Sequence, residues 1–228
     1  MQRKLVIWGG AGHAKVVADI LRLTGEFEIV GFIDDVNPRR IGSEFCGFPI
    51  LGGREEFEKL KNVGVTHVIF GFGDCNARLR LADVVRASGF ELATAIHPSA
   101  TVARDVQIGV GTVIAAAVVL CPGASVGQNV IINTCASVDH DCEIGNAVHL
   151  SPGVHVGGHV TVGQGTWVGI GATIRDHIRI GSGSMIGAGA VVVKDVPDQV
   201  VSFGVPSRVI RRLPANGANS TTSSLPSP

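Results

Sequence analysis

The sequence predicts two structural units: a Rossmann-like α/β domain over residues 1–95, followed by a β-solenoid of six-residue repeats over residues 96–197. Three observations predict this arrangement. Short apolar segments alternate with segments of helical periodicity in the first unit. One aliphatic position recurs every six residues in the second unit. Glycine supplies 31 of the 228 residues and aromatic residues only 5%, so Val, Ile, Leu and Ala must fill the core.

The first unit reads as alternating strands and helices. Strands are expected over residues 4–8, 28–33 and 66–70, because each is a short run rich in Val, Ile and Phe. Helices are expected over residues 14–23 and 76–88, where apolar residues recur at helical spacing, and Gly89 ends the second helix. This alternation predicts a small parallel sheet.

The second unit is defined by its period. From Ile96 onward in steps of six, seventeen consecutive positions hold Ile, Val or Leu, ending at Val192. Small or β-branched residues occupy most fifth places, and glycine is frequent at the second place, where we expect it to allow the turn conformation. Each hexad should form one short strand and one corner, with its first residue inward. The period does not specify the hand of the coil.

Two shorter segments follow the repeats. Residues 198–213 form a C-terminal segment beyond the last hexad. Residues 214–228 are small and polar, and we expect a disordered tail because they offer no apolar anchor.

Composition excludes several classes of partner. The chain carries 19 Lys and Arg against 19 Asp and Glu, with no basic run, which argues against a nucleic-acid partner. Its longest apolar run, residues 113–121, is too short to span a bilayer, so no membrane association is expected. Five cysteines without a C-x-x-C motif predict reduced thiols and a cytoplasmic protein.

A glycine turn between the first strand and the first helix is a candidate phosphate site. Gly10 and Gly12 lie in this turn, and Asp34 and Asp35 end the next strand. Amide groups at a helix N-terminus bind phosphates. Lys15 stands where the dinucleotide fingerprint has its third glycine, which favours a nucleotide phosphate over NAD. The alternative is a tight structural turn.

His140 is the candidate general base. It occupies the third place of its hexad, which should point outward, and it lies between two aspartates. An imidazole has a pKa near 6.5, and a neighbouring carboxylate can orient it for proton transfer. The alternative is an inert surface histidine. His159 and His177 are eighteen residues apart, so we expect them to stack as a surface ladder on adjacent coils.

Three segments together resemble one family: residues 9–17 (GGAGHAKVV), residues 31–35 (GFIDD) and residues 133–142 (NTCASVDHDC). They are similar to the hexapeptide-repeat sugar O/N-acyltransferases related to sialic acid O-acetyltransferase and to the nucleotide-amino-sugar N-acetyltransferases of bacillosamine synthesis. The resemblance implies a left-handed parallel β-helix with three hexads per coil, a homotrimer with each site between two helices, and acetyl-CoA as co-substrate.

The resemblance also implies roles for individual residues. The base is His140, oriented by Asp141, which is one methylene shorter than the glutamate often found there. His149 contacts the thioester end of acetyl-CoA; Gly158 and Trp167 are assigned to the same groove, although Trp167 could equally be a surface packing residue. No metal is expected. The resemblance assigns binding of the nucleotide-sugar to five residues of the first unit: Gly10, Gly12, His13, Asp34 and Asp35.

The implied activity is acetyl-CoA-dependent N-acetylation of a nucleotide-linked amino sugar, such as a UDP- or GDP-4-amino-4,6-dideoxy sugar, in polysaccharide biosynthesis. The alternative is O-acetylation of sialic acid or a related sugar hydroxyl, which the same base would serve. A hexapeptide-repeat carbonic anhydrase would need three zinc-binding histidines, two of them in an H-x4-H pair. The spacings His149-x5-His155 and His155-x3-His159 do not fit that pattern. A non-catalytic scaffold is a further alternative.

Overall fold

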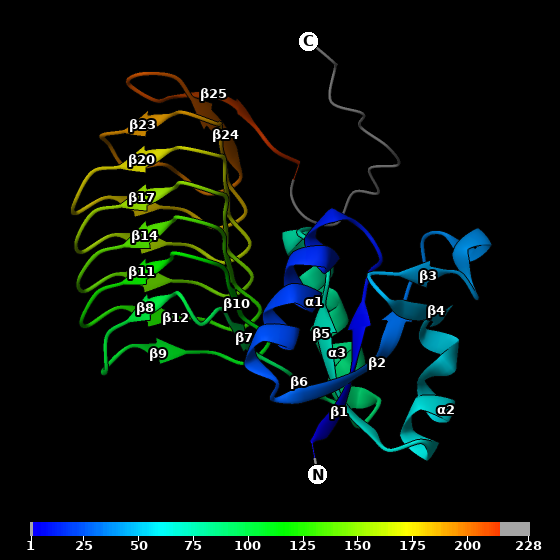
Figure 1. The fold of residues 1–228 in the computed structure, drawn as a ribbon. Coiled ribbons are helices and arrows are strands. Elements are labelled where there is room, and N and C mark those ends of the chain that lie inside the picture. Colours follow the sequence, from blue (N-terminus) through cyan, green and yellow to red (C-terminus); the bar gives the residue numbers. More distant parts are fainter. Residues whose placement is uncertain (1, 215–228) are drawn as a thin grey trace.

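A triangular β-helix and a three-layered α/β domain lie side by side (Figure 1). The structure, a computed structural model, describes residues 2–214. The tail predicted at residues 214–228 therefore lies outside the described residues, apart from Pro214. Within the described residues, no helix is long and apolar enough to cross a membrane.

The α/β domain is built on one six-stranded sheet in the order β3-β4-β2-β1-β5-β6, parallel except for β3. The predicted strands and helices are all present, whereas β3, β4, β6 and α2 were not predicted. Helix α1 covers one face of the sheet, and α2 and α3 cover the other. The bounds are β1 Arg3–Trp8, α1 Gly12–Thr24, β2 Phe27–Ile33, β3 Glu44–Phe45, β4 Phe48–Gly52, α2 Phe57–Asn62, β5 Val65–Phe70, α3 Cys75–Ala87 and β6 Glu91–Leu92, with 3-10 turns at Pro38–Arg40 and Arg54–Glu56.

The β-helix consists of two-residue strands, and each strand pairs in parallel with the strand eighteen residues later. They form three sheets: the domain-facing sheet (β7, β10, β13, β16, β19, β22), the second sheet (β8, β11, β14, β17, β20, β23) and the third sheet (β9, β12, β15, β18, β21). The bounds are β7 Ala95–Ile96, β8 Thr101–Val102, β9 Gln107–Ile108, β10 Val113–Ile114, β11 Val119–Leu120, β12 Ser125–Val126, β13 Ile131–Ile132, β14 Ser137–Val138, β15 Glu143–Ile144, β16 His149–Leu150, β17 His155–Val156, β18 Thr161–Val162, β19 Trp167–Val168, β20 Thr173–Ile174, β21 Arg179–Ile180, β22 Met185–Ile186 and β23 Val191–Val192.

All seventeen first-place residues predicted to point inward lie in one continuous core, with Ile96, Val102 and Ile108 partly buried at its open end. Strand β24 (Val200–Phe203) extends the domain-facing sheet, and β25 (Arg208–Arg212) pairs with it in the antiparallel sense.

The role expected for the second-place glycines was wrong. The left-handed backbone occurs at the fourth place instead, at all fourteen fourth places from Gly111 to Gly189. The second-place glycines are needed for close approach between coils. A Cβ on Gly145, for example, would lie 2.7 Å from the backbone nitrogen of Gln164 on the next coil. Glycine is thus favoured at two places of each hexad, the second because the coils approach closely and the fourth because the backbone is left-handed. These two requirements explain the glycine content.

Arg78 of α3 forms hydrogen bonds to both the α/β domain and the β-helix. Its side chain is fully buried. The guanidinium donates to the carbonyls of Phe70 (3.3 Å) and Phe72 (3.1 Å) at the end of β5, and to those of Gly111 (2.9 Å) and Asn129 (2.8 Å) on two corners of the β-helix. Burial lowers the pKa of Arg78 to about 9, so the group is still charged at neutral pH. One buried cation therefore connects the sheet with two coils.

Arg78→Met should reduce the free energy of unfolding by about 3–5 kcal/mol, because three buried carbonyls and one partly buried carbonyl lose their donor. Urea denaturation at pH 7 measures the change. Arg86→Met is the matched control, since Arg86 lies on the same helix and also reaches the β-helix, at Gln128, but is exposed; it should change stability by less than about 1 kcal/mol. Equal losses in the two variants would contradict the role given to Arg78.

Candidate active site

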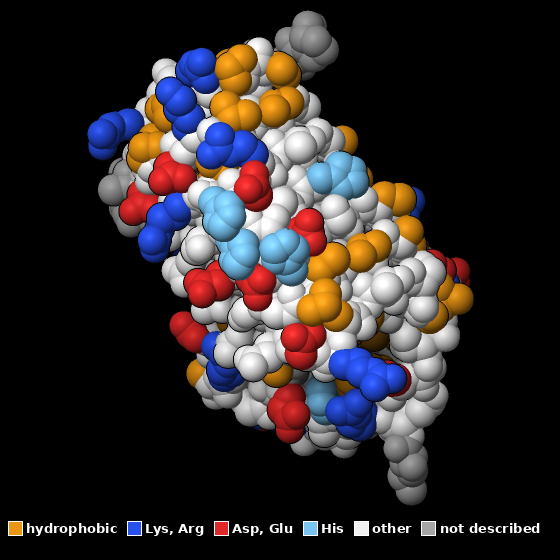
Figure 2. Space-filling view, turned by 90° about the vertical axis from the view of Figure 1, so that its left-hand side faces the viewer, with side chains coloured by type: hydrophobic (Ala, Val, Ile, Leu, Met, Phe, Trp, Pro, Cys, Tyr) orange, Lys and Arg blue, Asp and Glu red, His pale blue; other side chains and the backbone are white. Residues whose placement is uncertain are grey.

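The candidate base lies on a corner between the second and third sheets. We call this the histidine corner, comprising His140 and Asp141 on one coil, Gly158 and His159 on the next, and His177 on the one after. Figure 2 shows its histidines grouped, with acidic side chains beside them, on the side of the β-helix turned away from the α/β domain. The left-handed backbone of Asp141, with φ of 57°, directs its carboxylate toward the preceding ring.

His140 and Asp141 are in direct contact despite the shorter acid. The Nδ1 of His140 donates to Oδ2 of Asp141 at 2.9 Å. This hydrogen bond raises the pKa of His140 and lowers the pKa of Asp141. Because Nδ1 carries the bonded proton, the lone pair of the neutral ring lies on Nε2, and that atom can accept a proton.

Gly158 lies against the candidate base. A Cβ at this position would be 2.7 Å from both Cε1 and Nε2 of His140. The backbone of Gly158 is not left-handed, so close approach is what requires glycine here. The structure therefore places Gly158, which the resemblance assigned to the cofactor, next to the proton-accepting atom.

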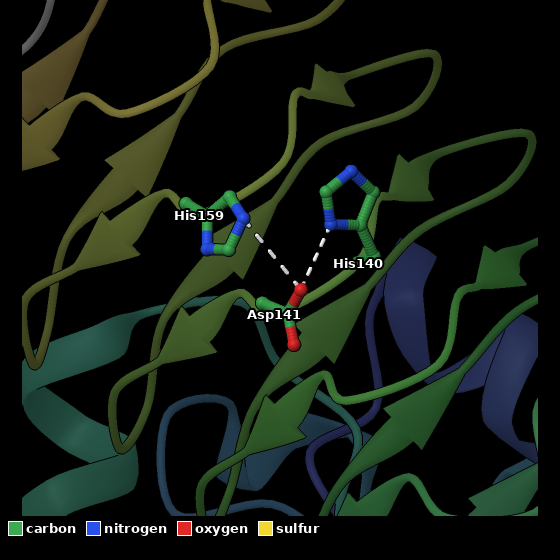
Figure 3. Close-up of side chains that lie close together, drawn as sticks. All are labelled: His140, Asp141 and His159. Atoms are coloured by element: carbon green, nitrogen blue, oxygen red, sulfur yellow. Dashed lines mark hydrogen bonds and ion pairs between the residues drawn. The ribbon is translucent and has the colours of Figure 1, made fainter.

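His159 extends this arrangement onto the next coil (Figure 3). Its Nε2 lies 3.6 Å from the same Oδ2 of Asp141, and its ring is edge-on to His140 at 5.1 Å. The stacking predicted for His159 and His177 is confirmed, with ring centroids 4.7 Å apart. Sequence reasoning missed the contact between Asp141 and His159, although these residues too are eighteen apart.

A second group of predicted site residues meets at the junction of the two units. His149 and Trp167 are register partners on β16 and β19, with ring centroids 6.5 Å apart. Nδ1 of His149 lies 3.3 Å from the carbonyl oxygen of Gly73, and the His13 ring in the first turn of α1 is 6.4 Å away. The structure thus brings together His13, assigned to the nucleotide-sugar, and His149, assigned to acetyl-CoA.

Both junction histidines are held in the neutral state. Burial, reinforced by the charge of Arg78, lowers the pKa of His13 to about 3 and that of His149 to about 4. The Nε2 atoms of both rings are buried, and neither has a hydrogen-bond partner among the described residues. The junction therefore holds two buried imidazole nitrogens whose hydrogen-bonding capacity is unused within the described residues.

The glycine turn forms a third group with residues that follow β2. Arg40 donates to the Gly10 carbonyl and lies 3.8 Å from Oδ2 of Asp34. Asp35 accepts from the Arg54 backbone amide at 2.8 Å. Asp34 and Asp35 thus contact the segments around Arg40 and Arg54, which surround the glycine turn. Arg40 was not predicted, because it belongs to a 3-10 turn without periodic signal.

The three histidines considered for a carbonic anhydrase do not converge. His149 lies on the domain-facing sheet, whereas His155 lies on the second sheet, where its Nδ1 is 2.8 Å from Oγ of Ser137. His159 lies on the histidine corner. The same geometry separates His140 from His149 within one chain, because the histidine corner is opposite the domain-facing sheet of the triangular coil.

Comparison with known proteins identifies both units. Residues 4–85 match the PglD N-terminal domain family, and residues 159–194 match the bacterial transferase hexapeptide family (six repeats). A search among curated proteins found no match.

Solved structures resemble the chain over nearly its whole length. A mutant of GDP-perosamine N-acetyltransferase from Caulobacter crescentus, in complex with CoA and GDP-perosamine, has 38% identity over 91% of this chain and 97% of its own, with a TM-score of 0.87. The acetyltransferase domain of PglB from Neisseria gonorrhoeae, also solved with acetyl-CoA, has 37% identity over 92% and 100%, with a TM-score of 0.85. These similarities confirm the left-handed parallel β-helix expected from the sequence.

The junction histidines predict a specific pH dependence of stability. Their pKa values are lower in the folded state than the ordinary 6.5, so the unfolded chain binds more protons as the pH falls. Their stabilising contribution is complete above pH 6.5 and is lost as the pH falls toward 4, by about 2 kcal/mol per histidine between pH 7 and pH 5. His149→Gln should remove about half of this loss in urea denaturation at the two pH values. An unchanged loss would show that His149 is not buried in its neutral form.

Proposed function

Because this chain belongs to the hexapeptide-repeat sugar acyltransferases, in the subfamily of the nucleotide-amino-sugar N-acetyltransferases, we propose that it transfers the acetyl group of acetyl-CoA to the amine of a nucleotide-linked amino sugar. The observation that carries the proposal is the His140–Asp141 pair, whose 2.9 Å hydrogen bond leaves Nε2 of the ring as the proton acceptor. We place this reaction in polysaccharide biosynthesis.

The base would act during attack on the thioester. The sugar amine attacks the thioester carbonyl while Nε2 of His140 removes its proton, and the thiolate of CoA then leaves. Asp141 stabilises the imidazolium that forms and holds the ring in one orientation. Corner backbone amides can stabilise the oxyanion. No covalent acyl-enzyme is required.

Binding is divided between the other two groups. The glycine turn, with Asp34 and Arg40 beside it, suits the nucleotide portion, since turn amides and a guanidinium both bind phosphate. The unpartnered Nε2 atoms of His13 and His149 support a place for the acyl end of acetyl-CoA at the junction. The Nε2 of His149 is a hydrogen-bond acceptor there, because Nδ1 of the neutral ring donates toward the Gly73 carbonyl. An open hollow of about 310 Å³ lies on the second sheet, and its lining includes Asp139, the residue that precedes the base. The free cysteines of the described chain fit the cytoplasmic location that we propose.

We propose that the chain forms the homotrimer that the resemblance implies, and the placement of these groups supports a site shared between neighbouring chains. The α/β domain lies against the domain-facing sheet of its own chain, while His140 projects from the opposite corner. A complete site therefore needs the α/β domain of one chain beside the histidine corner of another. Exposed aliphatic side chains such as Val119 (40% exposed) and Ile170 (59%) offer an apolar flank for this contact.

The activity is tested by release of the CoA thiol with a panel of nucleotide-amino sugars, and sialic acid serves as the hydroxyl acceptor. His140→Asn should lower kcat by about 10²–10⁴ while both substrates still bind. The pKa of His140 is raised, so the wild-type kcat should fall as the pH drops through a value above 6.5. The variant should lack this acidic limb, because Asn does not titrate.

His149→Ala is the control for that variant and should raise the KM for acetyl-CoA more than it lowers kcat. A His140→Asn enzyme within about threefold of wild type would exclude His140 as an essential base and leave positioning as the source of rate. If only the hydroxyl acceptor is acetylated, the chain is an O-acetyltransferase and the proposed N-acetylation is wrong.

Co-expression of His140→Asn and His149→Ala chains tests the shared site. Each site of a mixed trimer takes His140 from one chain and His149 from its neighbour, so about one quarter of the sites should be intact. At acetyl-CoA concentrations below the KM of the His149→Ala enzyme, activity should reach about one quarter of wild type. Activity no higher than the average of the two parents would place the whole site within one chain.

A further inference from the structure

We propose that His140, Asp141 and His159 form a binding site for one divalent transition-metal ion, of which zinc is the test case, and that the bound ion inhibits the enzyme. The metal site follows from the geometry of the histidine corner alone. Inhibition rests in addition on the proposed function, because it requires His140 to be the base.

Three ligand atoms converge at this corner (Figure 3). They are Nδ1 of His140, Oδ2 of Asp141 and Nε2 of His159, and all lie within 4.8 Å of one another. The carboxylate oxygen is 2.9 Å from the first nitrogen and 3.6 Å from the second. Ligands on a tetrahedral zinc ion are separated by about 3.3 Å, given metal–ligand bonds of about 2.0–2.1 Å. Small rotations of the exposed rings would bring the three atoms to that separation.

The backbone of the β-helix holds this site in place. The amide of His159 donates to the His140 carbonyl at 3.0 Å, which fixes the two coils relative to each other. Asp141 and His159 occupy fourth places of consecutive coils, both with φ of 57°. The backbone that carries the three ligand residues is therefore already ordered, and ion binding has to fix only their side chains. The His177 ring stacks on the His159 ring, but it lies outside the group of three ligand residues.

The donor set determines which ions fit. Two imidazoles and one carboxylate favour zinc, copper and nickel, whereas magnesium and calcium prefer oxygen ligands. The corner is exposed, so water can occupy the remaining coordination position of an ion bound by three side chains.

Occupancy of this site is incompatible with base catalysis. The ion would replace the Nδ1 proton and take up the Asp141 oxygen that otherwise stabilises the imidazolium. A coordinated cation on the ring also lowers the proton affinity of Nε2. The ion is therefore an inhibitor of the reaction and not its cofactor.

Isothermal titration of the untagged full chain with zinc chloride tests the site directly. Wild type should bind one ion, and both His140→Asn and His159→Asn should weaken binding at least tenfold. His177→Asn is the matched control: it lies on the next coil, and its Nε2 faces Asp176 at 3.8 Å. Asn tolerates the left-handed backbone at residues 159 and 177, so both variants should fold. The His177→Asn chain should bind zinc within twofold of wild type. Equal affinity in wild type and His159→Asn would overturn the metal site.

Thiol-release assays with added metal test inhibition. Zinc should inhibit wild type reversibly on addition of EDTA, magnesium and calcium should not, and His159→Asn should need at least tenfold more zinc for the same fractional loss. Zinc binding without any loss of rate would overturn the inhibitory role. If no acceptor is acetylated, the proposed function fails, and the titration still decides the metal site.

Discussion

The burial of one guanidinium sets the relation between the two units. Removing a charged group from water is unfavourable unless hydrogen bonds compensate, and four of the five N–H groups of Arg78 donate to backbone carbonyls. Two belong to the end of the central sheet and two to the corners of the β-helix, so the bonds form together only in one orientation of the domain. That orientation brings Gly73 to His149 and His13 to the same junction. Burial at this junction lowers the pKa of both histidines, and the charge of Arg78 adds to that effect.

A second constraint comes from the coil itself. Every corner between Gly111 and Gly189 turns through a left-handed residue at its fourth place, a conformation that disfavours side chains other than glycine and asparagine-like ones. The histidine corner carries Asp141, His159 and His177 at this place on three consecutive coils, where glycine would be less strained. Unfavourable backbone conformations of this kind concentrate at functional sites, because the surrounding structure maintains them. The same feature aims the Asp141 carboxylate at His140.

Periodic features were predictable from the sequence, and single contacts between distant segments were not. The inward first places and the His159–His177 stack follow from a fixed step along the chain, and the structure confirms both. Arg78 gave no signal, since an arginine on an amphipathic helix is ordinarily exposed. The meeting of His13 with His149 depends on how the units dock, which no local pattern encodes. The His140–Asp141 pair was inferred from the resemblance, and only the structure showed that the shorter acid reaches Nδ1.

The eighteen-residue register turns the surface of the β-helix into a regular lattice. Neighbouring strands in a sheet lie about 4.8 Å apart, so side chains at positions n and n + 18 are always within interaction range. A functional group can thus gain a neighbour through one substitution, without an insertion or a change of backbone, as Asp141 has with His159 above it and Gly123 below. Substrate preference in such a fold can diverge one coil at a time, while the core and the docking of the α/β domain stay the same.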